Sequence, residues 1–424
     1  MLDINFIKDN LELVKEGARK KHIEVDLDTL MQLDEQRRKL LAKIEDKRAQ
    51  QNATSKQIAQ ADTKEKSKLI EQMQSIKDEL KKEEAELKEV MQKWRAIMLQ
   101  VPNIPDISVP EGKDDEDNQE IKTWGEKPQF DFESKGHVEL MINLNMADFE
   151  RGTKVAGFRG YYLKGDGALL SWALWRYAQD FFLQKDFEPM IVPSLVRKET
   201  MMGTGYLPGG EDDLYRTQDD MYLTGTAEVA TMGYFMDEQI DLSDGPKKFL
   251  AFSPCFRREA GSHGKDVKGL IRVHEFFKWE QVILCEASHE ESVKWHEWLN
   301  RNTEEFVESL GIPYRTVANC GGDLGLGQVK KYDIELWVPG ENKYREISSA
   351  SYFHDFQTRR LNIKYKSPDT GKLTLAHSLN STAAPTPRFL VSIVENFQEK
   401  DGSIKIPEPL VRYMQKEYIK KPNG

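Results

Sequence analysis

The sequence is poor in cysteine and has no long apolar run. Its three cysteines, Cys255, Cys285 and Cys320, form no C-x-x-C pair in 424 residues, which argues against a disulfide framework and against a readable zinc site. No segment approaches the roughly 18 apolar residues of a membrane-spanning helix, and the first residues lack the apolar core of a secretory signal. These absences indicate a soluble intracellular protein, and the length suggests roughly two to three domains.

Proline and glycine are absent from residues 27–100, where apolar residues recur in steps of three and four. These residues are Leu30, Leu33, Leu40, Leu41, Ile44, Leu69, Met73, Ile76, Leu80, Leu87, Met91, Trp94 and Met98. The spacing predicts two helices with an apolar seam. Because residues 59–64 lack a seam residue, the chain can turn there. We expect an antiparallel helical hairpin that forms a rod roughly 45–50 Å long.

Acidic charge is concentrated outside this hairpin. The whole chain carries a net charge of −10, yet residues 1–100 hold 21 Lys and Arg against 20 Asp and Glu. Basic residues bunch locally in this first part at Arg19-Lys20-Lys21-His22 and Arg37-Arg38-Lys39, followed by Lys43, Lys47 and Arg48. A solvated helix face is the ordinary explanation, and a nucleic-acid partner competes with it only if the rest of the chain calls for one.

Beyond the hairpin the composition changes. Pro102 and Pro105 end the second helix, and the acidic residues 111–120 are typical of a linker. Strand-like and helical segments then alternate without regular βαβ units, which predicts an α+β domain with an antiparallel sheet flanked by helices. The predicted domains are a helical arm at 1–103, a linker at 104–130 and a β-sheet domain at 131–424.

Charged residues are densest at residues 255–280. If both flanks of the glycine-containing turn are strands, alternation places five of these residues on one face: Arg257, Glu259, Arg272, Phe276 and Glu280. Such a face offers cations for phosphates, an aromatic ring for a base and carboxylates for an amine or hydroxyl. A surface hairpin with paired charges explains the same residues equally well.

The segment FRREAGSHGKDVKGLIRVHEFFKWE resembles motif 2 of the class II aminoacyl-tRNA synthetases, specifically the bacterial type of the seryl-tRNA synthetase family. The resemblance covers nearly the whole chain. It includes VDLDTLMQLDEQRRKLLAKIEDKRAQQN, the motif-1-like FEPMIVPSLV, YLTGTAE, REISSASYFHDFQTRR and the motif-3-like RFLVSIVENFQEKDGSIKIPEPL. Several ordered motifs at family-like spacing are hard to obtain by chance.

This resemblance implies a reaction in which serine and ATP form seryl-adenylate before the acyl group passes to tRNA. Arg257 is expected to bridge the serine carboxylate and the α-phosphate, because a guanidinium fork suits both, and Arg388 is expected to grip the γ-phosphate. Glu259 would accept from the adenine amino group, and Phe276 would stack on the ring, although a core Phe is the alternative. The implied ATP contacts are Arg257, Arg258, Glu259, Arg272, Val273, Phe276, Glu346, Ile347, Ser348, Ser349 and Arg388.

The resemblance also implies a metal and an amino-acid pocket. Glu346 and Ser349 would supply oxygens to a Mg²⁺ ion bound with ATP, although simple strand alternation puts Glu346 with Ser348 and on the opposite face from Ser349. No zinc is expected. The implied serine contacts are Thr226, Ala227, Glu228, Arg257, Glu280 and Thr382.

One segment departs from the family pattern. Bacterial members usually carry a glycine-rich N-G-S-G-L-A-V-G-R before the motif 3 helix, whereas residues 380–388 here read NSTAAPTPR. Thr382 keeps a hydroxyl where Ser is common, and Pro385 and Pro387 stiffen the backbone.

In this family the helical arm reaches across a homodimer to the long extra arm of serine tRNA. The candidate tRNA contacts in this chain are Arg19, Lys20, Arg37, Arg38, Lys43, Lys47 and Arg48. The implied partners are therefore ATP, serine, tRNA(Ser), tRNA(Sec) where the host has one, and a second copy of the chain, in the cytoplasm. Two other interpretations stay open, a class II homologue that loads an amino acid onto a carrier protein and a non-catalytic scaffold. The helical arm argues against the first, and the retained charged residues argue against the second.

Overall fold

The structure is a computed structural model that describes residues 1–421 apart from 262, 263, 265 and 267. The chain divides into two compact units. The first unit comprises Leu2–Arg19 and Ile23–Pro102, and the second comprises Met1, Lys20–His22 and the residues from Asn103 onward. Within the described ranges, no helix has both the length and the apolarity needed to cross a membrane.

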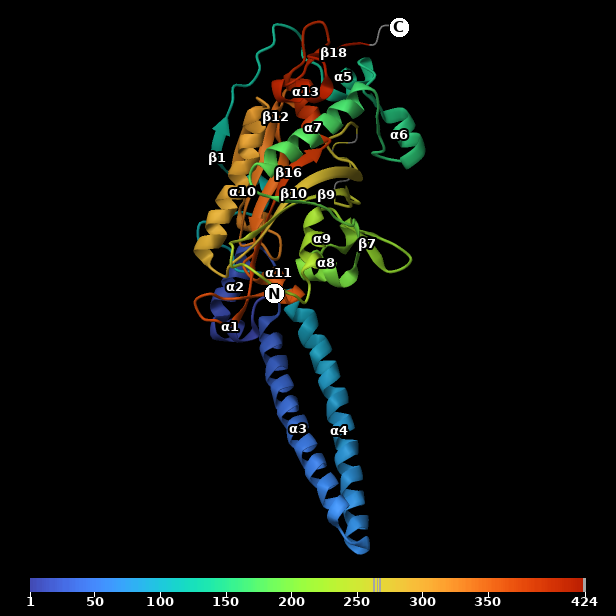
Figure 1. The fold of residues 1–424 in the computed structure, drawn as a ribbon, viewed down its shortest axis with the longest axis vertical. Helices are drawn as coiled ribbons and strands as arrows, with labels where there is room; N and C mark the ends of the chain where they lie inside the picture. Colours follow the sequence, from blue (N-terminus) through green and yellow to red (C-terminus); the bar gives the residue numbers. More distant parts are fainter. Residues whose placement is uncertain (262–263, 265, 267, 422–424) are drawn as a thin grey trace. The chain divides into compact units, whose positions relative to one another are not determined.

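Two long helices, α3 (Leu27–Gln60) and α4 (Thr63–Met98), form the predicted antiparallel hairpin (Figure 1). The chain reverses at Ala61 and Asp62, and the Asp62 carboxylate accepts from the backbone N–H groups of Lys64 and Glu65 at 3.1 and 3.0 Å. This side chain caps the free N–H groups that begin any helix. Two short helices, α1 (Ile4–Asp9) and α2 (Leu11–Lys20), precede the hairpin.

The hairpin buries a narrow apolar seam. Its buried side chains include Leu30, Leu40, Ile44, Met73, Ile76, Val90 and Met98. The prediction was wrong at one turn, because Met91 is 37% exposed whereas its neighbour Val90 is only 5% exposed. An α-helix has 3.6 residues per turn, whereas a strict heptad repeat requires 3.5. The buried position therefore shifts by one residue along a helix of this length.

The second unit is built on an eight-stranded sheet (Figure 1), which confirms the predicted α+β class. All neighbouring strands are antiparallel except β4 and β9, which are parallel. In spatial order the strands are β1 (Gln119–Trp124), β11 (Tyr314–Ala318), β12 (Lys330–Val338), β13 (Lys343–Tyr352), β16 (His377–Thr386), β10 (Glu275–Cys285), β9 (Lys247–Phe256) and β4 (Glu188–Ile191).

Smaller elements surround this sheet. The short strands are β2 (Ala147–Asp148), β3 (Tyr162–Leu163), β5 (Leu195–Arg197), β6 (Tyr215–Arg216), β7 (Met221–Leu223), β8 (Gln239–Ile240), β14 (Lys364–Lys366), β15 (Leu373–Leu375), β17 (Ile404–Lys405) and β18 (Tyr418–Ile419). The helices are α5 (His137–Asn143), α6 (Phe149–Ala156), α7 (Asp166–Leu183), α8 (Lys198–Thr204), α9 (Ala227–Tyr234), α10 (His289–Ser309), α11 (Phe356–Leu361), α12 (Arg388–Asn396) and α13 (Glu408–Met414). Single 3₁₀ turns occur at η1 (Asp115–Asp117), η2 (Glu211–Asp213), η3 (Gly321–Asp323) and η4 (Pro339–Glu341).

Helices α7, α10 and α12 share one hydrophobic core with the sheet. The rings of Phe182 and Phe306 lie 5.4 Å apart, and those of Phe306 and Phe389 lie 5.6 Å apart. All three rings are fully buried, and burial of each stabilises the fold by about 1.5–3 kcal/mol. This face of the sheet is therefore closed by helices.

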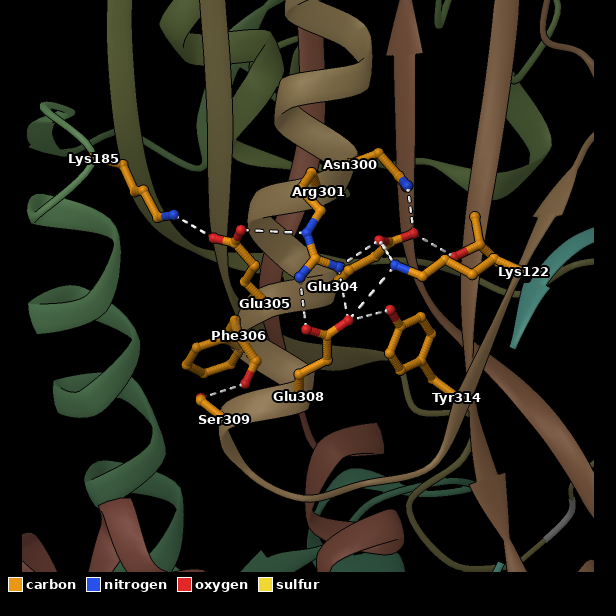
Figure 2. A network of polar contacts seen from close by, with 11 residues as sticks. Lys122, Lys185, Asn300, Arg301, Glu304, Glu305, Phe306, Glu308, Ser309 and Tyr314 are labelled. Atoms are coloured by element: carbon orange, nitrogen blue, oxygen red, sulfur yellow. Dashed lines mark hydrogen bonds and ion pairs between the residues drawn. The ribbon is translucent and has the colours of Figure 1, made fainter. Parts of the chain in front are cut away.

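Strand β1 lies within the predicted linker and pairs with β11 at the sheet edge. Figure 2 shows how Lys122 of β1 joins a polar network on α10, where it pairs with Glu304 and Glu308. Arg301 and Tyr314 also donate to Glu308, at 2.7 Å each. The Arg301 hydrogen bond lowers the pKa of Glu308 from its ordinary 4.5 to about 2. Pairing with the sheet edge and with these carboxylates fixes a segment whose acidic neighbours suggested a free connection.

Candidate active site

Strand β10 has one face that packs against helix α7 and an opposite face with charged side chains. Phe277 lies 5.0 Å from the ring of Trp175 on α7, and Trp279 donates from Nε1 to the Trp175 carbonyl at 3.1 Å. Because strand side chains alternate, Lys278 and Glu280 point to the opposite face. Sequence alternation already predicted a shared face for residues 276, 278 and 280, although Lys278 was not assigned to the site.

On that face, four side chains form a buried polar cluster, at the position where the family resemblance implies the amino-acid pocket. The Glu280 carboxylate accepts from the hydroxyls of Thr226 and Thr382 at 3.2 and 3.4 Å, and it forms an ion pair with Lys278. The Lys278 ammonium donates to both threonine hydroxyls at 3.2 Å. None of the four residues is more than 6% exposed. A buried ion pair that also contacts two hydroxyls offers both a positive and a negative group to a small polar ligand.

A second carboxylate, Glu228, lies near this pocket in the first turn of α9. Thr226 caps this helix, and Ala227, its first residue, is fully buried. Glu228 accepts from Gln357 Nε2 at 2.6 Å and from the Tyr206 hydroxyl at 3.0 Å. Burial, together with the charge of Glu280, raises the pKa of Glu228 to about 7. Gln357 and Tyr206 come from distant parts of the sequence, which gave no signal for either.

Three arginines converge beside the pocket. Arg388 donates to the carbonyl oxygens of Ile271 and Glu346 at 2.8 and 2.5 Å, and Arg272 donates to Glu259 at 2.6 Å. Burial lowers the pKa of Arg388, and the charges of Arg257 and Arg272 act in the same direction. Guanidinium groups that lie this close together can receive a polyanion.

The arrangement of this region differs from the predicted strand hairpin. Strand β9 ends at Phe256 and β10 begins at Glu275, so Arg257, Glu259 and Arg272 lie in the connecting loop. Glu259 adopts a positive φ of 56° and is joined to Arg272 by the ion pair. The residues thus come together through loop contacts and not through strand alternation, which was the wrong geometry.

Arg257 lies near both groups of residues. Its guanidinium is 5.4 Å from the centre of the Phe276 ring, and its charge acts on the pKa of both Tyr206 and Arg388. A β-carbon added at Gly225 would lie 3.3 Å from the Arg257 side chain, so the backbone approaches it closely. The neighbouring Arg258 is exposed, and its backbone N–H donates to the Asp213 carbonyl at 3.0 Å.

A β-bulge in β13 resolves the alternation problem at Glu346 and Ser349. Ser349 pairs with Asp333 and Glu346 pairs with Glu335, with a register shift that leaves Ile347 as the extra residue. Because Asp333 and Glu335 share a face of β12, their partners share it too. Glu346 and Ser349 therefore lie on one face, contrary to simple alternation. Among the predicted ATP contacts, Val273, Ile347 and Ser348 have buried side chains, and the Ser348 hydroxyl donates to the Thr382 carbonyl at 2.6 Å.

The proline-containing departure is accommodated at the end of β16. Residues 379–381 of β16 pair with β13, whereas residues 382 and 384–386 pair with β10 alone. Pro385 therefore lies where the strand has no hydrogen-bonded neighbour on one side. A proline, which has no N–H to donate, is tolerated in a strand at such a position. The Thr382 hydroxyl still reaches the pocket.

Comparisons with known proteins identify the family. Residues 1–105 match the seryl-tRNA synthetase N-terminal domain, and residues 212–397 match the tRNA synthetase class II core domain (G, H, P, S and T). Serine–tRNA ligase of Deinococcus radiodurans is 43% identical over 98% of this chain and 97% of its own length. The corresponding figures for the Thermodesulfovibrio yellowstonii protein are 44%, 98% and 99%.

The chain belongs to the seryl-tRNA synthetase family. Solved structures in that family agree with the fold. A seryl-tRNA synthetase from Pyrococcus horikoshii complexed with ATP is 38% identical, has a TM-score of 0.91 and covers all of both chains. The cytoplasmic serine–tRNA ligase from Naegleria fowleri in complex with AMP is 33% identical and has a TM-score of 0.87, over 100% of this chain and 99% of its own.

The basic residues predicted to bind tRNA fall into two groups in this member of the seryl-tRNA synthetase family. Four of them form ion pairs on the helices: Arg19 with Glu16, Arg37 with Asp34, Lys47 with Glu79 and Arg48 with Glu84. Arg37 also lies 5.2 Å from the Trp94 ring centre. By contrast, Arg38 and Lys43 are exposed, Lys20 is half-buried, and none of these three has an ion pair within the described part of the chain.

Proposed function

We propose that this protein is a serine–tRNA ligase, which condenses L-serine with ATP to seryl-adenylate and pyrophosphate and then transfers serine to tRNA. The observation that carries this proposal is a buried Thr226–Lys278–Glu280–Thr382 pocket beside three converging arginines. Full-length relatives with that name support it. The arrangement suits an amino acid on one side and a triphosphate on the other.

In this proposal Arg257 is the catalytic bridge between the two ligands. Its position between the pocket and Arg388 suits contact with both the serine carboxylate and the α-phosphate, where negative charge gathers in the transition state. Arg388 and Arg272 hold the remaining phosphates, with Arg388 on the γ-phosphate. Glu259 accepts from the adenine amino group, and Phe276 stacks on the ring. Arg258, Val273, Ile347 and Ser348 line the nucleotide, the last three through backbone atoms because their side chains are buried.

The residues also fit a magnesium ion bound with ATP. Glu346 and Ser349 share a face and offer the oxygen atoms that a hard cation prefers. Within the described residues, no group of three His, Cys, Asp or Glu side chains is arranged to hold a metal. The protein therefore contributes a partial shell that phosphates and water complete. When bound, the ion neutralises phosphate charge.

Serine is selected by its hydroxyl group. Glu228 and Glu280 attract the ammonium group, and Thr226 and Thr382 hydrogen-bond with the ligand's polar groups, while Ala227 limits the space at the start of α9. Alanine leaves these buried polar groups unpaired, which can reject it by about 10⁴–10⁵-fold. Threonine must be excluded by lack of space.

The helical hairpin is the tRNA-binding part. Seven basic residues, Arg19, Lys20, Arg37, Arg38, Lys43, Lys47 and Arg48, are the proposed contacts with tRNA(Ser) and, where the host has it, tRNA(Sec). Arg38 and Lys43 have the strongest support because they are exposed and form no ion pair in the described structure. Contacts of this kind read RNA shape and phosphates, so the arm needs few base-specific residues.

We further propose a cytoplasmic homodimer. Large apolar side chains are exposed on α7 and on the edge strand β4, including Trp172 at 54% and Ile191 at 87% exposed. A second copy can cover such residues, and pairing at the sheet edge would remove unpaired backbone groups.

Amino-acid-dependent ATP–pyrophosphate exchange with all twenty amino acids, with and without Mg²⁺, tests the proposed function. We expect exchange with serine and Mg²⁺ only. Exchange with another amino acid would mean that the segment before Arg388 has rebuilt the pocket, as a carrier-protein ligase could require. No exchange with any amino acid would favour the scaffold interpretation.

A further inference from the structure

A buried histidine–glutamate pair outside the proposed ligand contacts joins the segments that carry the ATP site. His137 lies at the start of α5, and Glu395 lies on α12, seven residues after Arg388. Their side chains are 8% and 1% exposed. One carboxylate oxygen of Glu395 accepts from both the backbone N–H and Nδ1 of His137, at 2.7 and 2.8 Å.

The other contacts of this pair reach two loops that lead into the site. The second carboxylate oxygen of Glu395 accepts from the Gly340 N–H at 2.8 Å, just before strand β13 with Glu346. The second ring nitrogen of His137, Nε2, lies 3.2 Å from the Leu270 N–H, two residues before Arg272. The Glu395 carboxylate thus connects the segments bearing Glu346 and Arg388 directly, and it connects the segment bearing Arg272 through His137.

These contacts determine which nitrogen of the His137 imidazole carries the proton. The Leu270 backbone N–H can only donate, so Nε2 must accept and cannot carry a proton. Nδ1 faces a carboxylate and therefore carries the proton. The ring is neutral, and the Glu395 carboxylate selects the tautomer that can hold the loop.

The loop backbone is built to approach this ring. Gly269 has a φ of +96°, and a β-carbon at this position would lie 2.2 Å from His137 Nε2. Only glycine adopts this conformation readily and leaves room for the ring. The next residue but one, Ile271, accepts from Arg388 through its carbonyl, so the held backbone directly contacts an arginine of the site.

We propose that His137 and Glu395 are positioning residues for ATP. They hold the backbone at 269–271, and through it Arg272 and Arg388, in the geometry that receives the triphosphate. The serine pocket stands on β10, β16 and α9, and these residues make no hydrogen bond to the pair in the described structure. Loss of the pair should therefore weaken ATP more than serine. This inference rests on the proposed function.

Two substitutions of one residue separate its two contacts. A glutamine at position 137 can place an oxygen near the Nε2 position and accept from Leu270, whereas an asparagine can donate from the Nδ1 position to Glu395 but cannot reach Leu270. We expect the KM for ATP in serine-dependent exchange to rise about tenfold in His137→Asn, from the loss of one buried hydrogen bond. In His137→Gln it should rise clearly less, and the KM for serine should change less than twofold in both.

Glu395→Gln should also raise the KM for ATP, because its amide would oppose the Gly340 or His137 donors. The matched control is Glu304→Gln, which alters a buried glutamate of the α10 network (Figure 2) whose printed partners, Lys122, Asn300, Arg301 and Thr316, include none of the proposed nucleotide contacts. It should lower the thermal midpoint without changing the ratio of the two KM values.

The proposal is overturned if His137→Asn and His137→Gln raise the KM for ATP equally, or if the KM values for serine and ATP rise together as in a merely destabilised protein. If the unchanged protein shows no serine-dependent exchange, the proposed function fails instead. In that case direct ATP binding, measured by calorimetry, supports the positioning role only if it weakens in His137→Asn and is kept in His137→Gln. Any other binding result overturns it.

Discussion

Charged side chains on α3 and α4 pair at the surface, whereas those around β10 are withdrawn from water. Arg48 and Glu84 of the hairpin are 61% and 43% exposed, and Lys278 and Glu280 of the pocket are 5% and 1% exposed. Exposed pairs contribute about 0–1 kcal/mol each, and buried pairs are expensive to desolvate. Exposed pairs of the hairpin can therefore be exchanged with little effect on folding, whereas the buried Lys278–Glu280 pair carries a desolvation cost that the proposed serine site explains.

The largest expected effect, a loss of adenylate formation without a loss of stability, should come from Arg257→Ala. The variant removes the proposed bridge between the two substrates, and adenylate formation should fall by at least about 10³-fold while the thermal midpoint stays near that of the parent. Arg151→Ala is the control, because Arg151 is exposed and pairs with Asp148, three residues away. Unchanged pyrophosphate exchange in Arg257→Ala would refute its assigned role.

Deletion of residues 28–100 should have the opposite effect, with adenylate formation kept and tRNA charging lost. Serine-dependent exchange should persist, because the site residues belong to the other compact unit. Charging of tRNA should fall by at least about 100-fold, because the phosphate contacts that dominate RNA affinity are lost. Normal charging by the truncated protein would contradict the proposed role of the arm, and the retained exchange rate serves as the control for folding.

Point substitutions on α3 can distinguish free from paired cations. Arg38→Ala with Lys43→Ala should raise the KM for tRNA by about tenfold and reduce its salt dependence, since two phosphate contacts are lost. Arg37→Ala with Lys47→Ala, the matched pair, should mainly destabilise the hairpin because Lys47 joins it to Glu79 and Glu83 of α4. Equal KM values for both double variants would show that exposure is not what selects the tRNA contacts.

The buried carboxylate Glu228 should give serine binding a pH dependence. Its pKa is raised to about 7, so it is neutral below that pH and negative above it. The KM for serine should fall by about threefold to tenfold between pH 6 and pH 8 as the charge that attracts the ammonium group appears. Glu228→Gln should remove this dependence, and an identical pH curve in the variant would assign it to another group.

The smallest effect is expected in the α10 network. The pKa of Glu308 is lowered from 4.5 to about 2, so its contribution to stability is complete above pH 4.5 and is lost as the pH falls toward 2. Chemical denaturation should show that Glu308→Gln costs about 1–2 kcal/mol at neutral pH and flattens the acid limb of the stability curve. If stability falls equally steeply with decreasing pH in the variant and in the unchanged protein, other carboxylates dominate the acid dependence.

Periodicity alone was enough for the hairpin, because its seam is a local pattern that Leu30, Leu40 and Met73 display in one stretch of chain. It was not enough for the site. Glu346 and Ser349 came from the family resemblance, and only a bulge that no sequence pattern announced places them on one face. Lys278 could have been found from the alternation with Glu280, whereas Gln357 and Tyr206 depend on tertiary contacts between distant segments.

The bulge at Ile347 makes the length of β13 as important as its composition. If one residue were deleted between Glu346 and Ser349, the ladder with β12 could close without a bulge and the sheet would keep its hydrogen bonds. Glu346 and Ser349 would then be two residues apart and would stay on one face. If the ladder closed without the bulge at the present strand length, the two side chains would instead lie on opposite faces, a defect that a comparison of residue types would not reveal.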